Sequence, residues 1–134
     1  VRESLEELGV KNVEKLSFIN CKLLLAFYHR IHSPVEGVVK KITSVSKEED
    51  LFGNNTLTII ELKTPDHGRV YMLLVGELKI QDFDAEIKVR DTVKPFQEIG
   101  KFDWGSQCVI LYESSEWTVN VNPGQKYFVG DTVI

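Results

Sequence analysis

The pattern of apolar and polar positions divides the chain into a short helical start and a long β region. Apolar residues recur at roughly helical spacing among glutamates in the first segment, at Leu5, Leu8, Val13 and Leu16, which predicts an N-terminal helix. From residue 16 onward, β-branched and aromatic residues dominate, and turn signals separate short apolar runs. These runs predict strands at residues 18–24, 36–44, 56–63, 69–76, 85–89, 107–113, 117–120 and 127–129.

Short strands at this spacing are typical of a barrel or a sandwich. A weak internal repeat points the same way, because VRDTV at 89–93 is echoed by VGDTV at 129–133. The Asp-Thr pair suits a turn that re-enters a strand, since an Asp side chain can bond nearby backbone amides. We therefore predict a mainly β fold, antiparallel and similar to a barrel-sandwich hybrid, with a short N-terminal helix. Its core should include Leu24, Val38, Ile59, Leu62, Val70, Leu73, Val75, Val109 and Leu111.

Some barrel-sandwich hybrids carry biotin or lipoate on a lysine at a hairpin tip, usually beside a methionine. The only methionine of this chain, Met72, lies instead inside a strand pattern. The sequence therefore argues against a carrier function.

Length and composition narrow the function classes. A chain of 134 residues is long enough for one domain, which we place at 1–134. The formal net charge of −4 argues against a nucleic-acid partner, because phosphate contacts need a basic face. The apolar run at 23–28, which no other run exceeds, is far shorter than a membrane span.

The two cysteines, Cys21 and Cys108, are too few for a disulfide framework. They are consistent with buried thiols in a reducing, intracellular compartment. The first residue is Val1 rather than Met, so we expect residues upstream and take the chain to be a fragment.

Two of the three histidines, His29 and His32, stand close together before Pro34. A zinc site would need a third ligand from His67, the cysteines or a carboxylate, and we expect no metal. The pair can be structural, or it can do acid–base work, since the unperturbed pKa of imidazole lies near neutrality.

A second candidate is the dipeptide Gly105-Ser106, which precedes an apolar strand pattern. On spacing alone such a dipeptide is a plain tight turn. It is not the nucleophile elbow of hydrolases, which needs G-x-S-x-G on a strand-to-helix turn.

Together, these segments resemble the phosphatidylserine decarboxylase family. Residues 28–37 read YHRIHSPVEG and resemble its Tyr-His-Arg-x-His-x-Pro-x-(Asp/Glu)-Gly signature. The segments that follow match in order: TPDHGRV at 64–70 resembles its hairpin, LLVG at 73–76 its glycine-bearing strand, and VKPFQEIGKF at 93–102 the approach to its processing site. The Gly-Ser dipeptide and the apolar strand after it resemble the processing site itself.

The resemblance implies a carboxy-lyase that makes its own cofactor by autocatalytic cleavage of a zymogen. Cleavage would fall between Gly105 and Ser106: the Ser106 hydroxyl attacks the Gly105 carbonyl, the ester eliminates, and the new N-terminus hydrolyses to a pyruvoyl group. The implied base for this step is His32, and His29 would handle a proton in the decarboxylation. The pyruvoyl group would accept the electrons released as CO₂ leaves.

The implied substrate is phosphatidylserine, or a related amino acid, and the implied role is phospholipid biosynthesis. Peripheral membrane contact would come from upstream residues, and the organelle is not implied. The alternative is an unprocessed, non-catalytic decarboxylase-like domain that binds lipid or protein. It arises because the family's orienting aspartate lies upstream of the histidine motif, whereas this chain has no Asp before Asp50, and because Gln107 stands where the family usually has Ser or Thr. We therefore expect His32 to lack the carboxylate that fixes its tautomer.

Overall fold

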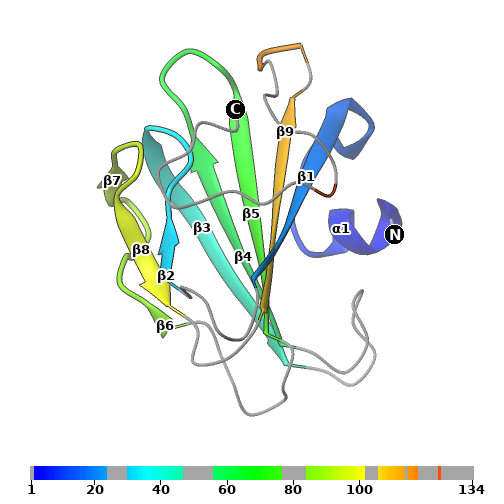
Figure 1. Ribbon diagram of the computed structural model, residues 1–134. Helices are drawn as coiled ribbons and strands as arrows, with labels where there is room; N and C mark the ends of the chain where they lie inside the picture. Colours follow the sequence, from blue (N-terminus) through cyan, green and yellow to red (C-terminus); the bar gives the residue numbers. More distant parts are fainter. Residues whose placement is uncertain are drawn as a thin grey trace.

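The computed structural model describes residues 2–23, 30–46, 56–76, 84–101, 106–113, 115–117 and 124. These residues form a mainly antiparallel β protein with a small helical part at the N-terminus (Figure 1). The elements are α1 (Arg2–Glu7), the 3-10 turn η1 (Val13–Lys15), β1 (Leu16–Leu23), β2 (Arg30–His32), β3 (Gly37–Ser46), β4 (Thr56–Lys63), β5 (Arg69–Gly76), β6 (Asp84–Ala85), β7 (Thr92–Val93), β8 (Glu98–Lys101) and β9 (Ser106–Glu113).

The strands form two open sheets. The larger has six strands in the order β1-β9-β5-β4-β3-β7, and the smaller has three in the order β2-β8-β6. Every pairing is antiparallel. The predicted antiparallel β fold with a short N-terminal helix is therefore confirmed, and over the described strands neither sheet closes into a barrel.

Both faces of the large sheet are covered. On one face, Met72, Leu74 and Ile110 pack with Ile31 of β2 and Ile99 of β8. On the other, alternate residues of the same strands pack against Leu5 and Val10 of the N-terminal segment. Figure 1 shows α1 and the small sheet on opposite sides of the large one. Since both faces are buried, the central strands carry nearly continuous apolar runs.

The longest strands agree best with the sequence predictions. The strands predicted at 56–63 and 69–76 have those bounds in the structure, and those at 18–24, 36–44 and 107–113 correspond to β1, β3 and β9. The predicted positions 118–120 and 127–129, and the second repeat copy at 129–133, lie outside the described residues; Trp117 is described and is not in a strand.

The strand predicted at 85–89 is wrong beyond Ala85, because the chain turns there. Arg90 has a φ of 83° and donates its amide to the Val39 carbonyl at 2.8 Å. The Asp91 carboxylate accepts from the amide of Lys88 at 3.0 Å, so this Asp stabilises a turn, as expected of the repeat. The carboxylate bonds an amide before it in the chain rather than one after it.

The N-terminal helix is shorter than the apolar spacing predicts. It ends at Glu7, and Gly9 follows with a φ of 96°. A glycine in the left-handed region after the last turn is a common helix terminator, because its lack of a Cβ removes the steric penalty. The amide of Val10 then bonds back to the Leu5 carbonyl at 3.0 Å, which turns Val10 into the core.

Most of the predicted core is confirmed. Ile59, Leu62, Val70, Leu73, Val75, Val109 and Leu111 are buried, and Met72 lies inside β5. Val38 was expected in the core but is half-buried, because its neighbour Val39 takes the core position next to a β-bulge. Leu24 lies outside the described residues.

Candidate functional site

Ser106 is the first residue of β9, at one end of the large sheet. Its backbone lies opposite Leu23 of β1 on one side and Gly76 of β5 on the other. Gly76 lies opposite Thr56, and Thr56 lies opposite Ser46. We call this row of strand ends the Ser106 end. The bond between residues 105 and 106 therefore immediately precedes a strand that is paired on both sides.

His32 lies in β2, in the small sheet. Its Nδ1 atom is 2.8 Å from the carbonyl oxygen of Phe96. A carbonyl oxygen only accepts hydrogen bonds, so Nδ1 carries the hydrogen and donates it. In the neutral ring the lone pair is then on Nε2, which is the atom that can take a proton.

The ring of Phe96 also contacts the imidazole. The two ring centroids are 4.7 Å apart with an interplanar angle of 13°, a stacked arrangement. His32 is thus held at one edge by a hydrogen bond and over one face by an aromatic ring, and the same residue supplies both contacts.

Two charged residues of the small sheet, Arg30 and Glu98, lie close to His32. Glu98 lies opposite His32 in the β2–β8 pair and forms an ion pair with Arg30, Nη1 to Oε2, at 2.7 Å. Desolvation acts to raise the pKa of Glu98, but hydrogen bonds with Glu86 and Arg30 outweigh it, so this pKa lies below its usual value; the charges of Arg30 and His32 act in the same direction.

The pKa of Glu86 moves the opposite way. A hydrogen bond with Glu98 raises it, and desolvation and the negative charge of Glu98 add to the rise. Glu86 is therefore the carboxyl that holds a proton to higher pH, and Glu98 is the one that stays ionised beside His32.

The structure describes two of the four predicted site residues. Ser106 and His32 lie in described strands, whereas His29 and Gly105 lie outside the described residues. The pairing of His32 with Glu98 leaves eight residues of chain to Ser106, which spans at most about 28 Å when extended. The predicted proximity of His32 to Ser106 is compatible with this connection and stays a prediction.

We expected His32 to lack the carboxylate that fixes its tautomer, and the acceptor beside its Nδ1 is a main-chain carbonyl, that of Phe96. This carbonyl accepts from Nδ1 and so selects the tautomer that a carboxylate at the same atom would select. Sequence reasoning missed Phe96 because every residue has a carbonyl, so the type of residue carries no signal. The available signal was Pro95, which favours the second position of a turn and so predicts a tight turn at this point.

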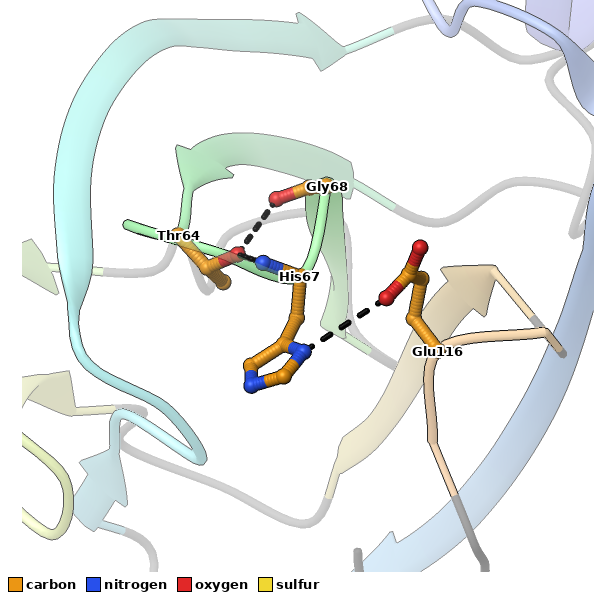
Figure 2. Close-up of polar contacts among 4 residues, drawn as sticks. All are labelled: Thr64, His67, Gly68 and Glu116. Atoms are coloured by element: carbon orange, nitrogen blue, oxygen red, sulfur yellow. Dashed lines mark hydrogen bonds and ion pairs between the residues drawn. The ribbon is translucent and has the colours of Figure 1, made fainter.

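The third histidine lies at the opposite end of the large sheet, in the turn between β4 and β5 (Figure 2). Thr64 Oγ1 donates to the Gly68 carbonyl at 2.7 Å and accepts from the His67 amide at 2.9 Å. The His67 ring lies 3.5 Å from Glu116, Nδ1 to Oε2, and 5.2 Å from the Trp117 ring, centroid to centroid. We call this the hairpin end.

Two further predictions concern the cysteines and a metal site. Cys21 and Cys108 lie opposite each other in β1 and β9, and both are free. Burial raises the pKa of both thiols, which disfavours the reactive thiolate form. In the described part of the chain, no three His, Cys, Asp or Glu residues gather as a metal ion would need, and no helix is long and apolar enough to cross a membrane.

Comparison with known proteins gives a consistent result. The family described as "Phosphatidylserine decarboxylase" matches residues 2–134. The chain is 31% identical over 96 residues to phosphatidylserine decarboxylase proenzyme 2 of Komagataella phaffii, a match covering 63% of this chain and 10% of that protein. It is 34% identical over 123 residues to phosphatidylserine decarboxylase proenzyme of Chlamydia caviae, covering 77% of this chain and 40% of that one.

A third relative, phosphatidylserine decarboxylase proenzyme of Fusobacterium nucleatum, is 25% identical over 123 residues, with 82% of this chain and 41% of that protein covered. The chain thus spans about a tenth of the fungal relative and about two fifths of these bacterial ones. No solved structure matches the chain significantly.

Proposed function

The chain belongs to the phosphatidylserine decarboxylase family, and from this membership we propose that it is the processed core of a carboxy-lyase that converts phosphatidylserine to phosphatidylethanolamine and CO₂. The names of its relatives describe proenzymes, which supports an enzyme made active by cleavage. We place that cleavage between Gly105 and Ser106.

The observation that carries the proposal is how the small sheet packs on β9. Residues two apart in a strand belong to the same face, so position 106 shares a face with Cys108 and Ile110. Those two residues pack in one buried cluster with Ile31, the neighbour of His32 in β2. Ile31 of the histidine strand therefore covers the face of β9 to which position 106 belongs. The register of β2 shifts between Ile31 and His32, and this irregularity interrupts the alternation that would direct the imidazole away from that face.

In the proposed reaction the Ser106 hydroxyl attacks the Gly105 carbonyl, and His32 accepts the hydroxyl proton. A serine hydroxyl is a weak nucleophile until a base removes its proton. His32 suits this role because its Nδ1 carries a hydrogen for the Phe96 carbonyl, which leaves the Nε2 lone pair as the proton acceptor. The ester then eliminates, and the new N-terminus at position 106 hydrolyses to a pyruvoyl group with loss of ammonia.

The residues present fit a pyruvoyl cofactor. It derives from Ser106, so the chain itself would hold it through the β9 backbone, which is paired with β1 and β5 over the length of the strand. The group supplies an electron sink for the pair of electrons released as CO₂ leaves. His29 would deliver or hold a proton in that step.

We also propose that the chain works at a lipid surface in a reducing, intracellular compartment. The substrate of its relatives, by their names, is a phospholipid with a serine headgroup. A cytosolic thiol–disulfide poise would keep Cys21 and Cys108 free, as they are in the structure.

Intact mass under denaturing conditions tests the cleavage. The 134-residue chain should separate into a large fragment ending at Gly105 and a small one of residues 106–134, while Ser106→Ala should remain a single species of 15.3 kDa. Without denaturant the two fragments should stay together, since β9 pairs with strands on both sides. A parent chain that stays whole would contradict the proposal and leave a non-catalytic binding domain.

Release of CO₂ tests the substrate. Vesicles containing phosphatidylserine should yield CO₂ with the cleaved protein and none with Ser106→Ala. Release from free serine at an equal rate would contradict the phospholipid assignment while leaving the carboxy-lyase in place.

A further inference from the structure

We propose that Phe96 is a positioning residue for His32, fixing its tautomer through the main-chain carbonyl and its ring plane through the aromatic side chain. This inference rests on the proposed function for its catalytic consequence, because it concerns the base of the proposed cleavage. Its structural part concerns the imidazole alone and is tested separately.

The carbonyl contact determines which nitrogen can act. At 2.8 Å, the Nδ1–H of His32 and the Phe96 carbonyl form an ordinary hydrogen bond. A carboxylate in this position holds the imidazole of a catalytic triad in one tautomer, and loss of that tautomer costs several powers of ten in rate. A neutral carbonyl makes the same geometric choice without bringing a negative charge to the ring.

The ring contact determines the plane of the imidazole. With Phe96 stacked at 4.7 Å and 13°, rotation of the His32 ring about its Cβ–Cγ bond would break the stack and the hydrogen bond together. Stacked aromatic pairs contribute beyond the burial of their area. Two contacts from one residue therefore hold the ring more narrowly than either could alone.

The exposure of Phe96 argues against a purely structural role in the core. Its side chain is 53% exposed, one of three exposed large apolar residues among those described. A solvated phenylalanine contributes little to folding, so its aromatic ring is best explained by what it touches.

The backbone of Phe96 is held in an unfavourable conformation. Its φ is 69°, in the left-handed region that non-glycine residues rarely adopt. Such conformations persist only where surrounding contacts enforce them, and they are common at functional sites.

Four hydrogen bonds enforce this turn. The Phe96 amide donates to the Ser33 carbonyl at 2.8 Å, and the Ser33 amide donates to the Gln97 carbonyl at 2.8 Å. The Gln97 amide bonds the Lys94 carbonyl at 3.1 Å, and the Lys94 amide bonds Gln97 Oε1 at 3.0 Å. Because Ser33 follows His32 directly, the turn is tied to the same strand end that carries the histidine.

The spectroscopic test uses the chain with Ser106→Ala, which removes the nucleophile, and ¹⁵N-labelled histidine. At a pH where the ring is neutral, the ¹⁵N shifts of His32 should report the Nδ1–H tautomer, and its ring protons should be shifted upfield by Phe96. Phe96→Leu should abolish the upfield shift, and Phe96→Tyr should retain it. An Nε2–H tautomer in the Ser106→Ala chain would overturn the proposal.

The kinetic test compares cleavage rates in chains that keep Ser106. Phe96→Leu should slow cleavage by about fivefold, which corresponds to about 1 kcal/mol of lost stacking, and Phe96→Tyr should restore the rate. Phe96→Val should slow it more, because a β-branched residue resists the positive φ and displaces the carbonyl. Two matched controls, Phe18→Leu at an exposed ring in β1 and Arg90→Gly at another positive φ, should leave the rate unchanged.

Together, the spectroscopic and kinetic tests distinguish failure of the proposed function from failure of the positioning role of Phe96. If the parent never cleaves while the His32 signals behave as expected, the proposed function fails and the positioning role of Phe96 stands. If the parent cleaves and every Phe96 variant cleaves at the parental rate, the positioning role is wrong and the proposed function stands.

Discussion

His67, at the hairpin end of the large sheet, and His32, in the small sheet, differ in what holds their rings. At the hairpin end, the His67 side chain is 53% exposed and pairs with Glu116 at 3.5 Å, a carboxylate that is itself 38% exposed. His32 lies in the strand whose Ile31 belongs to the same buried cluster as Cys108 and Ile110 of β9. Its ring has a 2.8 Å hydrogen bond and a stacked aromatic neighbour. A histidine–carboxylate pair is the arrangement a search for triads would select, and the pair of His67 and Glu116 lies at the end of the large sheet opposite Ser106.

His67 and position 106 lie at opposite ends of the strand β5. Gly68 and Gly76 bound the two ends of β5, and eight residues of antiparallel strand extend about 27 Å. A base at His67 is therefore far beyond hydrogen-bond reach of position 106. Both histidines have an acidic neighbour, Glu116 for His67 and Glu98 for His32. The closer hold on the ring, by a hydrogen bond and a stacked aromatic side chain, is what distinguishes His32 as the candidate base.

The largest expected effect on cleavage comes from comparing a serine substitution at each end of the large sheet. Ser106→Ala should abolish cleavage, because alanine has no hydroxyl to attack Gly105. Ser115→Ala, at an exposed position of the turn at the hairpin end, should cleave like the parent. Electrophoresis under denaturing conditions reads both, and a cleaved Ser106→Ala chain would refute the assignment of the two ends.

The two histidines give the next effect. His32→Ala should slow cleavage by about 100-fold or more, the usual contribution of a positioned general base, with circular dichroism unchanged. His67→Ala should leave the rate within a factor of about two, since its ring is solvated and remote. Equal slowing by both substitutions would remove the distinction between the ends.

The buried strand that joins the two ends should respond alike on both faces. Met72→Ala and Leu73→Ala remove neighbouring side chains that are 1% and 2% exposed and belong to opposite faces. Each should lower the free energy of unfolding by about 2–5 kcal/mol, measured by urea denaturation. A loss below about 1 kcal/mol at one position would mean that one face of the sheet is not a packed layer.

These central strands were the part of the fold most readable from the sequence. The run from Tyr71 to Val75 is continuously apolar because both faces are buried. Its length and its flanking turns still give the bounds of β5. The predicted core included Val70, Leu73 and Val75 of this strand and left out Met72 and Leu74, which are equally buried.

The small strands and the histidine contact could not be predicted in this way. β2, β7 and β8 have 3, 2 and 4 residues, too few for a periodic pattern, and tertiary packing decides them. The His32–Phe96 contact joins positions 64 residues apart through a backbone atom. The motif could identify His32, but only the fold places a carbonyl beside it.

An ion pair at the hairpin end should matter for stability and not for chemistry. Arg69 Nε lies 2.9 Å from Glu61 Oε2, and the Glu61 side chain is 7% exposed. Arg69→Met should cost about 1–3 kcal/mol of unfolding free energy by leaving a buried carboxylate unpaired, seen as a lower urea midpoint. Cleavage should proceed at the parental rate; a slowed rate would couple the hairpin end to the reaction.

The smallest effect concerns the acidic pair beside His32. Glu86, whose pKa is raised, contributes stability at low pH that is lost as pH rises through its folded pKa. Glu98, whose pKa is lowered, contributes stability at higher pH that is lost as pH falls through its folded pKa. Carboxyl ¹³C titration should find Glu86 titrating above Glu98, and Glu98→Gln should lower the pKa of Glu86. The reverse order of titration would contradict the hydrogen bond between these two carboxyl groups.

The most direct test of the account is the distance between His32 and position 106 in a crystal structure of the uncleaved Ser106→Ala chain. A hydrogen bond from the serine hydroxyl to Nε2 requires a heavy-atom separation of about 3 Å, or one bridging water. The account therefore predicts that His32 Nε2 lies within about 5 Å of the Cβ atom at position 106, with Nδ1 still bonded to the Phe96 carbonyl. A separation above about 8 Å would contradict it, because no proton could then pass from residue 106 to this imidazole.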